Sequence, residues 1–346
     1  MSLRTRRSSS LGGIVAMAVV LGLAFTSRSR SRPLTERIER PPIVGISHIG
    51  VNTDNLAAAR AFYTGILGLS DAFSLDDPPG KLLLTYFKVN DHQFIEVFPG
   101  KRTAAEGWLS HIAFETTDAE QLREYLASKG IKVPDKLPPM LDGNRGFEVT
   151  DPDGHTVEFV QLMPGSLHIR DFGKHLPITR ISDHIIHVGA TVRDRAAADK
   201  FYKDILGFHE FWQGGMKDGR TDWVDMRVPN GNDWLEYMLN VGDHPSIRTL
   251  GIVNHVALGV RNVNAAYKIL LGREPKLAEK PQIGRDGKWQ LNLYDPDLTR
   301  VEMMEPKPVR KPCCSPMTQQ RSGRSAPPQC RQWYEKLKTA RFLKSS

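Results

Sequence analysis

The sequence predicts an α+β protein built from four βαβββ modules, which pair into two curved sheets of mixed strand direction. Two observations lead to this fold class. A strand-like segment containing one His occurs four times, and each time a strand-like segment containing one Glu follows at nearly the same distance. A helical pattern lies between the two segments. Self-similarity at a fixed spacing is the sequence signature of a repeated structural unit.

Each predicted module begins with a strand that carries a His. The strand-like segments span residues 46–51, 109–114, 185–190 and 252–257, and their His residues are His48, His111, His187 and His255. In the first segment Ile49 and Val51 point to one face of the strand, so His48 points to the other. In the third segment His184 is a competing candidate, but His187 fits the spacing of the other modules without a gap.

A helix is predicted after each of these strands. In the first module apolar side chains recur at helical spacing, and Asp54 is positioned to cap the N-terminus. Gly68 is positioned to end the helix in the left-handed region. The sequence Ala-Phe-Tyr-Thr-Gly-Ile-Leu-Gly at 61–68 matches Lys-Phe-Tyr-Lys-Asp-Ile-Leu-Gly at 200–207, an offset of 139 residues. The first and third modules are therefore the most similar pair, as duplication of a two-module unit predicts.

Three strand-like segments are predicted after each helix, and the last of them carries a Glu flanked by apolar residues. These residues are Glu96, Glu158, Glu236 and Glu302, and the His-to-Glu separations are 48, 47, 49 and 47 residues. In the second and fourth modules the last two strands are joined by residues 151–154 (Asp-Pro-Asp-Gly) and 295–298 (Asp-Pro-Asp-Leu). Pro and Asp favour such turns, and Gly154 supplies a positive φ.

The nearly constant His-to-Glu spacing predicts metal centres. A helix on one face of a four-stranded sheet buries the Ile and Val side chains, which leaves His and Glu on the opposite, concave face. We call this face a cup. Two modules side by side bring two His and two Glu together, and a buried carboxylate is costly unless it is paired or bound to a cation. Two imidazoles and two carboxylates suit a divalent ion such as Zn, Ni, Co, Mn or Fe(II), with one ion per cup.

These features together resemble the vicinal oxygen chelate superfamily, also called the glyoxalase/bleomycin-resistance/dioxygenase superfamily. The resemblance rests on the strand His, the Phe-Tyr helix that ends in Ile-Leu-Gly, the Asp-Pro-Asp-Gly hairpin and the final strand Glu, and it covers about residues 43–306. It implies two glyoxalase-like domains, at 41–165 and 181–308, joined by a linker at 166–180. Which modules share a sheet is left open by the sequence. The metal ligands that the resemblance implies are His48, Glu96, His111 and Glu158 in the first half and His187, Glu236, His255 and Glu302 in the second.

The resemblance also implies chemistry on a small substrate that offers two neighbouring oxygens to the metal. In glyoxalase-like or epimerase-like members a ligand Glu takes the proton next to a carbonyl, and Glu158 and Glu302 occupy the matching positions. An isomerase, lyase or epimerase with these two residues as bases is therefore expected. Residues near the last hairpins either bind an anionic substrate and line the cups or are ordinary surface charges and packing residues. They are Arg145, Arg285, Lys288 and Trp289.

Two other functions remain open. An extradiol ring-cleaving dioxygenase would use a triad of His187, His255 and Glu302, and its four-module architecture favours this alternative. Against it, Glu236 would add a fourth ligand, and residues 285–289 read Arg-Asp-Gly-Lys-Trp where such enzymes place an acid–base His. The third alternative is a non-catalytic small-molecule-binding protein of the bleomycin-resistance type, although the presence of all eight ligand residues argues against it.

The two ends of the chain differ from its middle. Arg4, Arg6 and Arg7 precede an uncharged, mostly apolar run at 11–25, which suits a signal peptide and is short for a membrane span. We expect residues 1–40 to be a signal peptide or membrane anchor with a basic linker, so that the protein is exported or anchored, and a cytoplasmic protein is the alternative. We expect residues 309–346 to form a basic, disordered tail.

The net positive charge of the chain comes from these ends. The net charge is +8, with +6 in residues 1–40 and +9 in residues 307–346, which leaves the middle at −7. A nucleic-acid-binding protein should carry its basic surface on the folded domain, so nucleic acid is not an expected partner. We expect a small-molecule substrate, membrane contact through the N-terminal segment alone, and a monomer or homodimer. Cys313, Cys314 and Cys330 all lie near the C-terminus, so no disulfide framework is predicted for the core.

Overall fold

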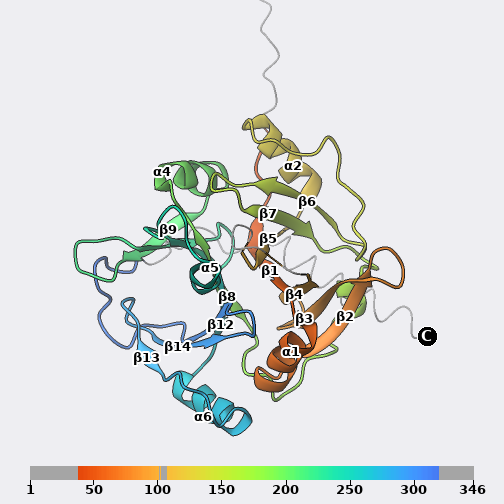
Figure 1. Ribbon diagram of the computed structural model, residues 1–346. Helices are drawn as coiled ribbons and strands as arrows, with labels where there is room; N and C mark the ends of the chain where they lie inside the picture. The colour runs from red at the N-terminus through yellow and green to blue at the C-terminus, as the bar shows by residue number, and fades with distance from the viewer. Residues whose placement is uncertain (1–37, 101, 103–106, 319–346) are drawn as a thin grey trace, which may run out of the picture. The chain divides into compact units, whose positions relative to one another are not determined.

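The computed structural model describes residues 38–100, 102 and 107–318. The expected signal peptide or anchor, and the tail beyond residue 318, lie outside the described residues. Within the described residues, no helix is both long enough and apolar enough to cross a membrane. The described chain belongs to one compact unit from Ile38 onward, and it contains two β-sheets (Figure 1).

The first sheet has seven strands in the order β2-β3-β4-β1-β5-β7-β6. Its strands are β1 (Ile43–Thr53), β2 (Ser70–Asp76), β3 (Leu82–Lys88), β4 (Phe94–Pro99), β5 (Leu109–Thr116), β6 (Arg145–Thr150) and β7 (Thr156–Gln161). At its centre β1 and β5 are antiparallel, and each has a parallel neighbour on its outer side, β4 and β7 respectively. The first two modules therefore share one sheet and meet through their His-bearing strands.

The second sheet repeats this arrangement with eight strands in the order β13-β14-β15-β12-β8-β11-β10-β9. Its strands are β8 (Ile185–Thr191), β9 (His209–Gly214), β10 (Trp223–Arg227), β11 (Trp234–Met238), β12 (His255–Gly259), β13 (Gln282–Ile283), β14 (Trp289–Tyr294) and β15 (Arg300–Met304). β8 and β12 form the antiparallel centre, flanked in parallel by β11 and β15. The pairing that the sequence left open is thus module one with two and module three with four.

The second module departs from the predicted βαβββ order. After its helix α2 (Ala119–Ser128) it contributes only β6 and β7, and residues 129–144 form no strand. This segment contains Pro134, Pro138 and Pro139, and proline cannot donate to a strand ladder. The prediction of three strands after every helix is therefore wrong for this module. In the fourth module the corresponding strand, β13, has two residues.

Of the remaining helices, those after the His strands of the first, third and fourth modules follow the predicted positions with one change at a cap, whereas α3 (Leu167–Arg170) and α5 (Ile247–Val253) were not predicted. The helices at predicted positions are α1 (Leu56–Arg60), which continues into the π-helix η1 (Ala61–Ile66), α4 (Arg195–Ala198), which continues into the π-helix η2 (Asp199–Ile205), and α6 (Val263–Arg273). The side chain of Asn55, rather than the predicted Asp54, caps α1 by accepting from the N–H of Ala58 at 3.1 Å. Asn and Asp cap equally well, so composition could not separate two adjacent candidates. Gly68 follows η1 with a φ of 71°, as predicted.

Strand alternation divides the side chains of the first sheet between two faces. Ile49 of β1 and Ile95 of β4 are fully buried in the main core, together with Phe62 and Tyr63 of η1. Successive side chains of a strand point to opposite faces, so the neighbouring His and Glu positions face away from the helices. The core thus places the chemistry-bearing residues on the face that the sequence predicted.

Two reciprocal hydrogen bonds connect the two halves. The hydroxyl of Tyr63 in η1 donates to Asp295 at 3.0 Å, and the hydroxyl of Tyr202 in η2 donates to Asp151 at 2.9 Å. Each bond runs from the Phe-Tyr helix of one half to the Asp-Pro-Asp hairpin of the other. The Phe-Tyr helix motif and the Asp-Pro-Asp hairpin motif of the sequence therefore both contribute to the contact between the two halves.

Two segments assigned to a linker and a tail fold back onto the sheets. In the first, the N–H of Leu167 donates to the carbonyl of Asp142 at 2.8 Å, which seats α3 beside β6. In the second, the N–H of Val309 donates to Gly287 and that of Thr318 to Phe211, each at 2.9 Å. Residues 309–318, expected to be disordered, are thus packed on the second half. Cys313 and Cys314 in this segment form a disulfide.

Candidate metal centres

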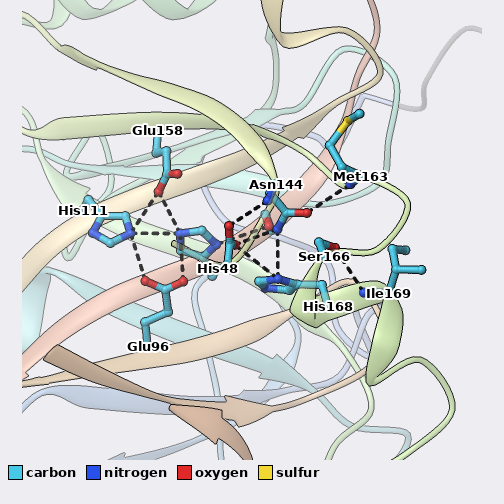
Figure 2. Close-up of polar contacts among 11 residues, drawn as sticks. His48, Glu96, His111, Asn144, Glu158, Met163, Ser166, His168 and Ile169 are labelled. Carbon is cyan, nitrogen blue, oxygen red and sulfur yellow. Dashed lines mark hydrogen bonds and ion pairs between the residues drawn. The ribbon is translucent and has the colours of Figure 1, made fainter. Parts of the chain in front are cut away.

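Four side chains of the first half converge on its concave face (Figure 2). The Nε2 atoms of His48 and His111 lie 2.9 Å apart. A carboxylate oxygen of Glu158 lies 3.0 Å from Nε2 of His48 and 3.4 Å from Nε2 of His111, and the oxygens of Glu96 lie 3.4 and 3.5 Å from the same two atoms. All four side chains are buried. They come from β1, β4, β5 and β7, the four central strands of the sheet.

The first cup fits a divalent metal ion. The converging lone pairs of two imidazoles and two carboxylates repel one another unless a proton or a cation lies among them. Among the described residues, no Lys or Arg forms an ion pair with Glu96 or Glu158. A buried set of two nitrogens and two carboxylates is chemistry suited to zinc, nickel, cobalt, manganese or ferrous iron.

Glycines two residues after a His allow the two modules of each half to meet. Gly50 lies opposite His111 across the β1–β5 pair, and a Cβ at this position would lie 2.4 Å from the His111 ring. Gly189 lies opposite His255 in the same way, where a Cβ would lie 2.1 Å from the ring. A glycine inside a strand marks a close approach of another group. The ligand geometry therefore depends on these two positions.

A serine precedes each His of the first cup. Nδ1 of His48 lies 3.3 Å from Oγ of Ser47, and Nδ1 of His111 lies 3.3 Å from Oγ of Ser110. Metal-binding His residues use the ring nitrogen that does not face the metal in a hydrogen bond that fixes the orientation of the ring. Both His residues of the first cup have a partner for this purpose.

Charge coupling within the first cup favours ionised side chains. Burial lowers the pKa of His48, but the charge of Glu96 and the hydrogen bond with Glu158 outweigh it and raise the pKa to about 9. Burial raises the pKa of Glu158, but the hydrogen bond and charge of His48 lead to a net lowering. The carboxylate of Glu158 is thus available as an anionic ligand or as a base.

His168 of α3 lies beside this cup (Figure 2). Its Nδ1 accepts a hydrogen bond from the Asn144 amide at 2.9 Å, which leaves the proton on Nε2. Within the described residues Nε2 is buried and has no hydrogen-bond partner. The rings of Phe73, Tyr86 and Phe94 surround the imidazole edge to face, with centroids 4.7 to 5.3 Å away. Burial lowers the pKa of His168 to about 3, helped by the charge of His48, so the imidazole is neutral at physiological pH.

The corresponding residues of the second half also converge. The Nε2 atoms of His187 and His255 lie 3.0 Å apart. The carboxylate of Glu236 lies 3.9 and 3.3 Å from these atoms, and that of Glu302 lies 3.8 and 3.7 Å from them. His184, the competing candidate, instead pairs with Asp233 at 2.8 Å. His187 is therefore the third-module His that lies among the other ligand candidates.

The second cup contains a cation of its own. Nη2 of Arg300 lies 2.7 Å from Nε2 of His255 and 3.8 Å from a carboxylate oxygen of both Glu236 and Glu302. Burial raises the pKa of Glu302 to about 7, opposed by the charge of Arg300. Burial, with the charges of His255, Lys288 and Arg300, lowers the pKa of His187 well below its ordinary value. His187, Glu236 and His255 still lie close enough together to hold an ion, but the second cup differs from the first in having a guanidinium beside them.

Only one of the four residues predicted to bind substrate lies among the charged groups of a cup. Lys288 is buried, with Nζ 3.0 Å from Asp286 and 4.4 Å from the ring centre of Trp234, which stacks on His187. Arg285 binds the carbonyl of Gly215 in the β9–β10 loop. Trp289 packs against the main core, and Arg145 is exposed on β6, on the same face as the core residue Phe147. The spacing along the sequence predicted where the hairpins lie but not the directions in which these side chains point.

His168 and Arg300 were not among the site residues predicted from the sequence. Arg300 had a usable signal, because it precedes Glu302 by two residues on one strand and alternation puts both on the same face. His168 had none, because its place beside the first cup depends on how residues 162–171 fold back over β6.

Comparison with known proteins places the chain in a family. A sequence model of the Glyoxalase/Bleomycin resistance protein/Dioxygenase superfamily matches residues 45–159 and 184–303. These two matches cover more than half of the chain, one in each sheet, and the chain belongs to this superfamily.

Individual relatives fall into two groups. Lactoylglutathione lyases from two strains of Neisseria meningitidis are 27% identical over 125 residues, which is 34% of this chain and 91% of theirs. The solved structure of the 2,3-dioxygenase LapB from Pseudomonas sp. KL28 aligns with a TM-score of 0.58 at 16% identity, over 80% of this chain and 98% of that one. Homoprotocatechuate 2,3-dioxygenase from Brevibacterium fuscum aligns with a TM-score of 0.57 at 19% identity, over 77% and 82%. At these identities the two structures show a shared fold.

Proposed function

We propose that the chain is a divalent-metal-dependent enzyme that moves a proton next to a carbonyl on a small substrate with two neighbouring oxygens. The proposal places the reaction in the first cup. The observation that carries it is the convergence of Glu96 and Glu158 on the paired imidazoles of His48 and His111, with His-to-Glu distances of 3.0 to 3.5 Å in a buried site. The similarity to lactoylglutathione lyases supports a reaction of the lyase or isomerase type.

We assign three of the four side chains to binding the metal ion and the fourth to abstracting the proton. A bound divalent ion supplies Lewis-acid polarisation of the substrate oxygens. His48, His111 and Glu96 would hold the ion, with their donor atoms 2.9 to 3.5 Å from one another. The hydrogen bond and charge of His48 lower the pKa of Glu158, which keeps its carboxylate ionised and able to accept a proton. Glu158 is therefore the residue that takes the proton, on a carboxylate oxygen.

His168 supports the binding of the substrate rather than the metal. Its imidazole is neutral, and the N–H at Nε2 has no hydrogen-bond partner within the described residues. An unpaired buried donor is costly, and a substrate oxygen would satisfy it. The surrounding Phe73, Tyr86 and Phe94 exclude water from this wall of the cup.

A ring-cleaving dioxygenase is the alternative that the solved structures raise. In the second half its triad would be His187, His255 and Glu302. The guanidinium of Arg300 lies among these three residues and counts against the binding of a catechol and a metal there. This contact favours proton transfer in the first cup over ring cleavage in the second.

Hydrogen–deuterium exchange tests the proposal directly. We expect the metal-loaded protein in heavy water to exchange the proton next to the carbonyl of small α-hydroxyketones or α-hydroxyaldehydes, followed by NMR. Glu158→Gln should slow this exchange by about 100-fold or more, within the range typical of general-base catalysis, while Glu302→Gln should leave it unchanged.

Three outcomes would contradict the proposal. One is exchange that Glu158→Gln does not change. Another is exchange that is lost in Glu302→Gln instead. The third is oxygen consumption with catechols by the iron-loaded protein without any exchange, which would support the dioxygenase.

A further inference from the structure

One of the differences between the two cups is at a position that faces the candidate ligands. Arg300 stands two residues before Glu302 in β15, and Thr156 stands two residues before Glu158 in β7. Each therefore shares a strand face with the neighbouring Glu. The first cup thus has a short neutral side chain at the position where the second has a long cation.

We infer that Arg300 is the built-in cation of the second cup, so that the chain loads one metal ion, in the first cup, rather than two. Nη2 of Arg300 lies 2.7 Å from Nε2 of His255 and 3.8 Å from the carboxylates of both Glu236 and Glu302. Three of the four groups that would hold a metal ion thus face the guanidinium. The side chain of Arg300 is only 14% exposed.

The spacing of the donors agrees with this assignment. In the first cup the four His-to-Glu distances run from 3.0 to 3.5 Å. In the second cup they run from 3.3 to 3.9 Å. The wider spacing of the donors in the second cup accommodates the guanidinium of Arg300, which already lies among them.

The second cup also lacks the serines that orient the ligand rings of the first. The residues that correspond to Ser47 and Ser110 are Ile186 and Asn254. Nδ1 of His187 is buried without a hydrogen-bond partner in the described part of the chain. Asn254 uses its side chain to accept from the N–H of Thr191 at 2.9 Å. His255 keeps an outer partner, because its Nδ1 lies 2.8 Å from the carbonyl oxygen of Val253, so the missing partner is that of His187. Loss of one such partner weakens metal binding by about 10 to 100-fold in known sites.

Fixed charge adds to the exclusion of a metal. Lys288 is also buried in this half, and its charge, like that of Arg300, acts on His187 and on Glu302. Lys288 is itself paired with Asp286 at 3.0 Å, so the guanidinium of Arg300 is the cation that a dication entering the cup would have to expel from a buried position. Arg300 supplies a counter-charge to the two carboxylates in the absence of a metal ion.

A reciprocal exchange of the two residues tests the inference. The probe is Co²⁺ or Zn²⁺ added to chelator-treated protein, with bound ions per chain measured by elemental analysis and by the Co²⁺ absorption spectrum. Wild type should bind one ion, Arg300→Thr should gain a second, and Thr156→Arg should lose the first. Arg248→Thr, which removes an exposed arginine on α5, should behave as wild type.

Further variants assign the ions to the cups. His187→Asn should leave the wild-type content unchanged but remove the ion gained in Arg300→Thr. Arg300→Met tests the same exclusion should the threonine variant fail to fold. Wild type with two ions, one of them lost in His187→Asn, would overturn the inference, as would a folded Arg300→Thr or Arg300→Met protein that gains no ion.

The inference and the proposed function can fail separately. If the first cup bound no metal, wild type would carry none, and Arg300→Thr would still gain one ion that His187→Asn removes. That result would support the role of Arg300 while contradicting the metal-dependent reaction in the first cup.

Discussion

At the scale of single residues, each cup depends on a glycine that has no chemistry of its own. Gly50 and Gly189 stand two residues after a ligand His, on the same strand face, and each lies against the His of the adjacent module. A methyl group in either place would overlap the imidazole ring. The His-x-Gly pattern is therefore part of the geometry that brings two modules to one centre.

Gly50→Ala should weaken metal binding in the first cup. The added Cβ would lie 2.4 Å from the His111 ring, and overpacking of this kind costs about 1–3 kcal/mol. We expect metal affinity to fall at least tenfold, measured by titration with Co²⁺. Gly189→Ala is the matched control, because it should lose a similar amount of stability while metal content stays unchanged. Equal metal affinity in Gly50→Ala and wild type would show that His111 can move without cost.

At the scale of elements, the helices and hairpins connect the halves through buried carboxylates. The hydroxyl of Tyr63 in η1 donates to Asp295, whose other oxygen accepts from the N–H groups of Asp297 and Thr299. Burial raises the pKa of Asp295 to about 7, and the charge of Asp297 adds to this effect. The protonation state of Asp295, in the hairpin that precedes β15, therefore changes near neutral pH.

Asp295 should make the protein less stable as pH rises. Its pKa is about 7 in the folded chain and about 3.9 in an unfolded one, so the folded state binds the proton more tightly. The stability that protonation contributes is fully present below about pH 4 and is lost as pH rises through about 7. Asp295→Asn should remove this loss, measured as the pH dependence of the urea midpoint between pH 5 and 8. The exposed substitution Asp243→Asn should keep the wild-type slope, and an unchanged slope in Asp295→Asn would contradict the prediction.

At the scale of the whole molecule, the two halves have the same strand order at their centres but differ in what they hold. Each half joins two modules through antiparallel strands that carry His residues, and each sends a Phe-Tyr helix to the hairpin of the other. The first half has α3 and His168 beside its cup, whereas residues 309–318 fold over the second half and Arg300 lies within its cup. The same strand order thus occurs twice, and the side chains beside the two cups differ.

Metal removal should therefore destabilise the protein through the first half alone. A ligand that binds only the folded state stabilises it by about 2.7 kcal/mol at 100 times its Kd. A chelator should lower the melting temperature of wild type and of His187→Asn, measured by calorimetry. His48→Asn should show no change on chelation. A chelator effect that disappears in His187→Asn would instead place the metal in the second half.

The sequence by itself determined the repeated pattern, the positions of the candidate metal ligands and their shared face. It could do so because strand alternation and helical spacing are local properties, so that His48, Glu96 and their equivalents are located by counting along the chain. The same local rule would have placed Arg300 beside Glu302. The superfamily was recognisable for this reason.

The tertiary structure decided everything that depends on long-range contact. Module pairing follows from which His strands meet at β1–β5 and β8–β12. The missing strand of the second module depends on where a proline-rich segment falls in the sheet, and the place of His168 depends on a linker that folds back over β6. Whether a buried His and Glu set is free for a metal depends on the reach of Arg300 from the same strand. Side-chain reach and burial are set by packing between distant segments, which spacing along the chain does not specify.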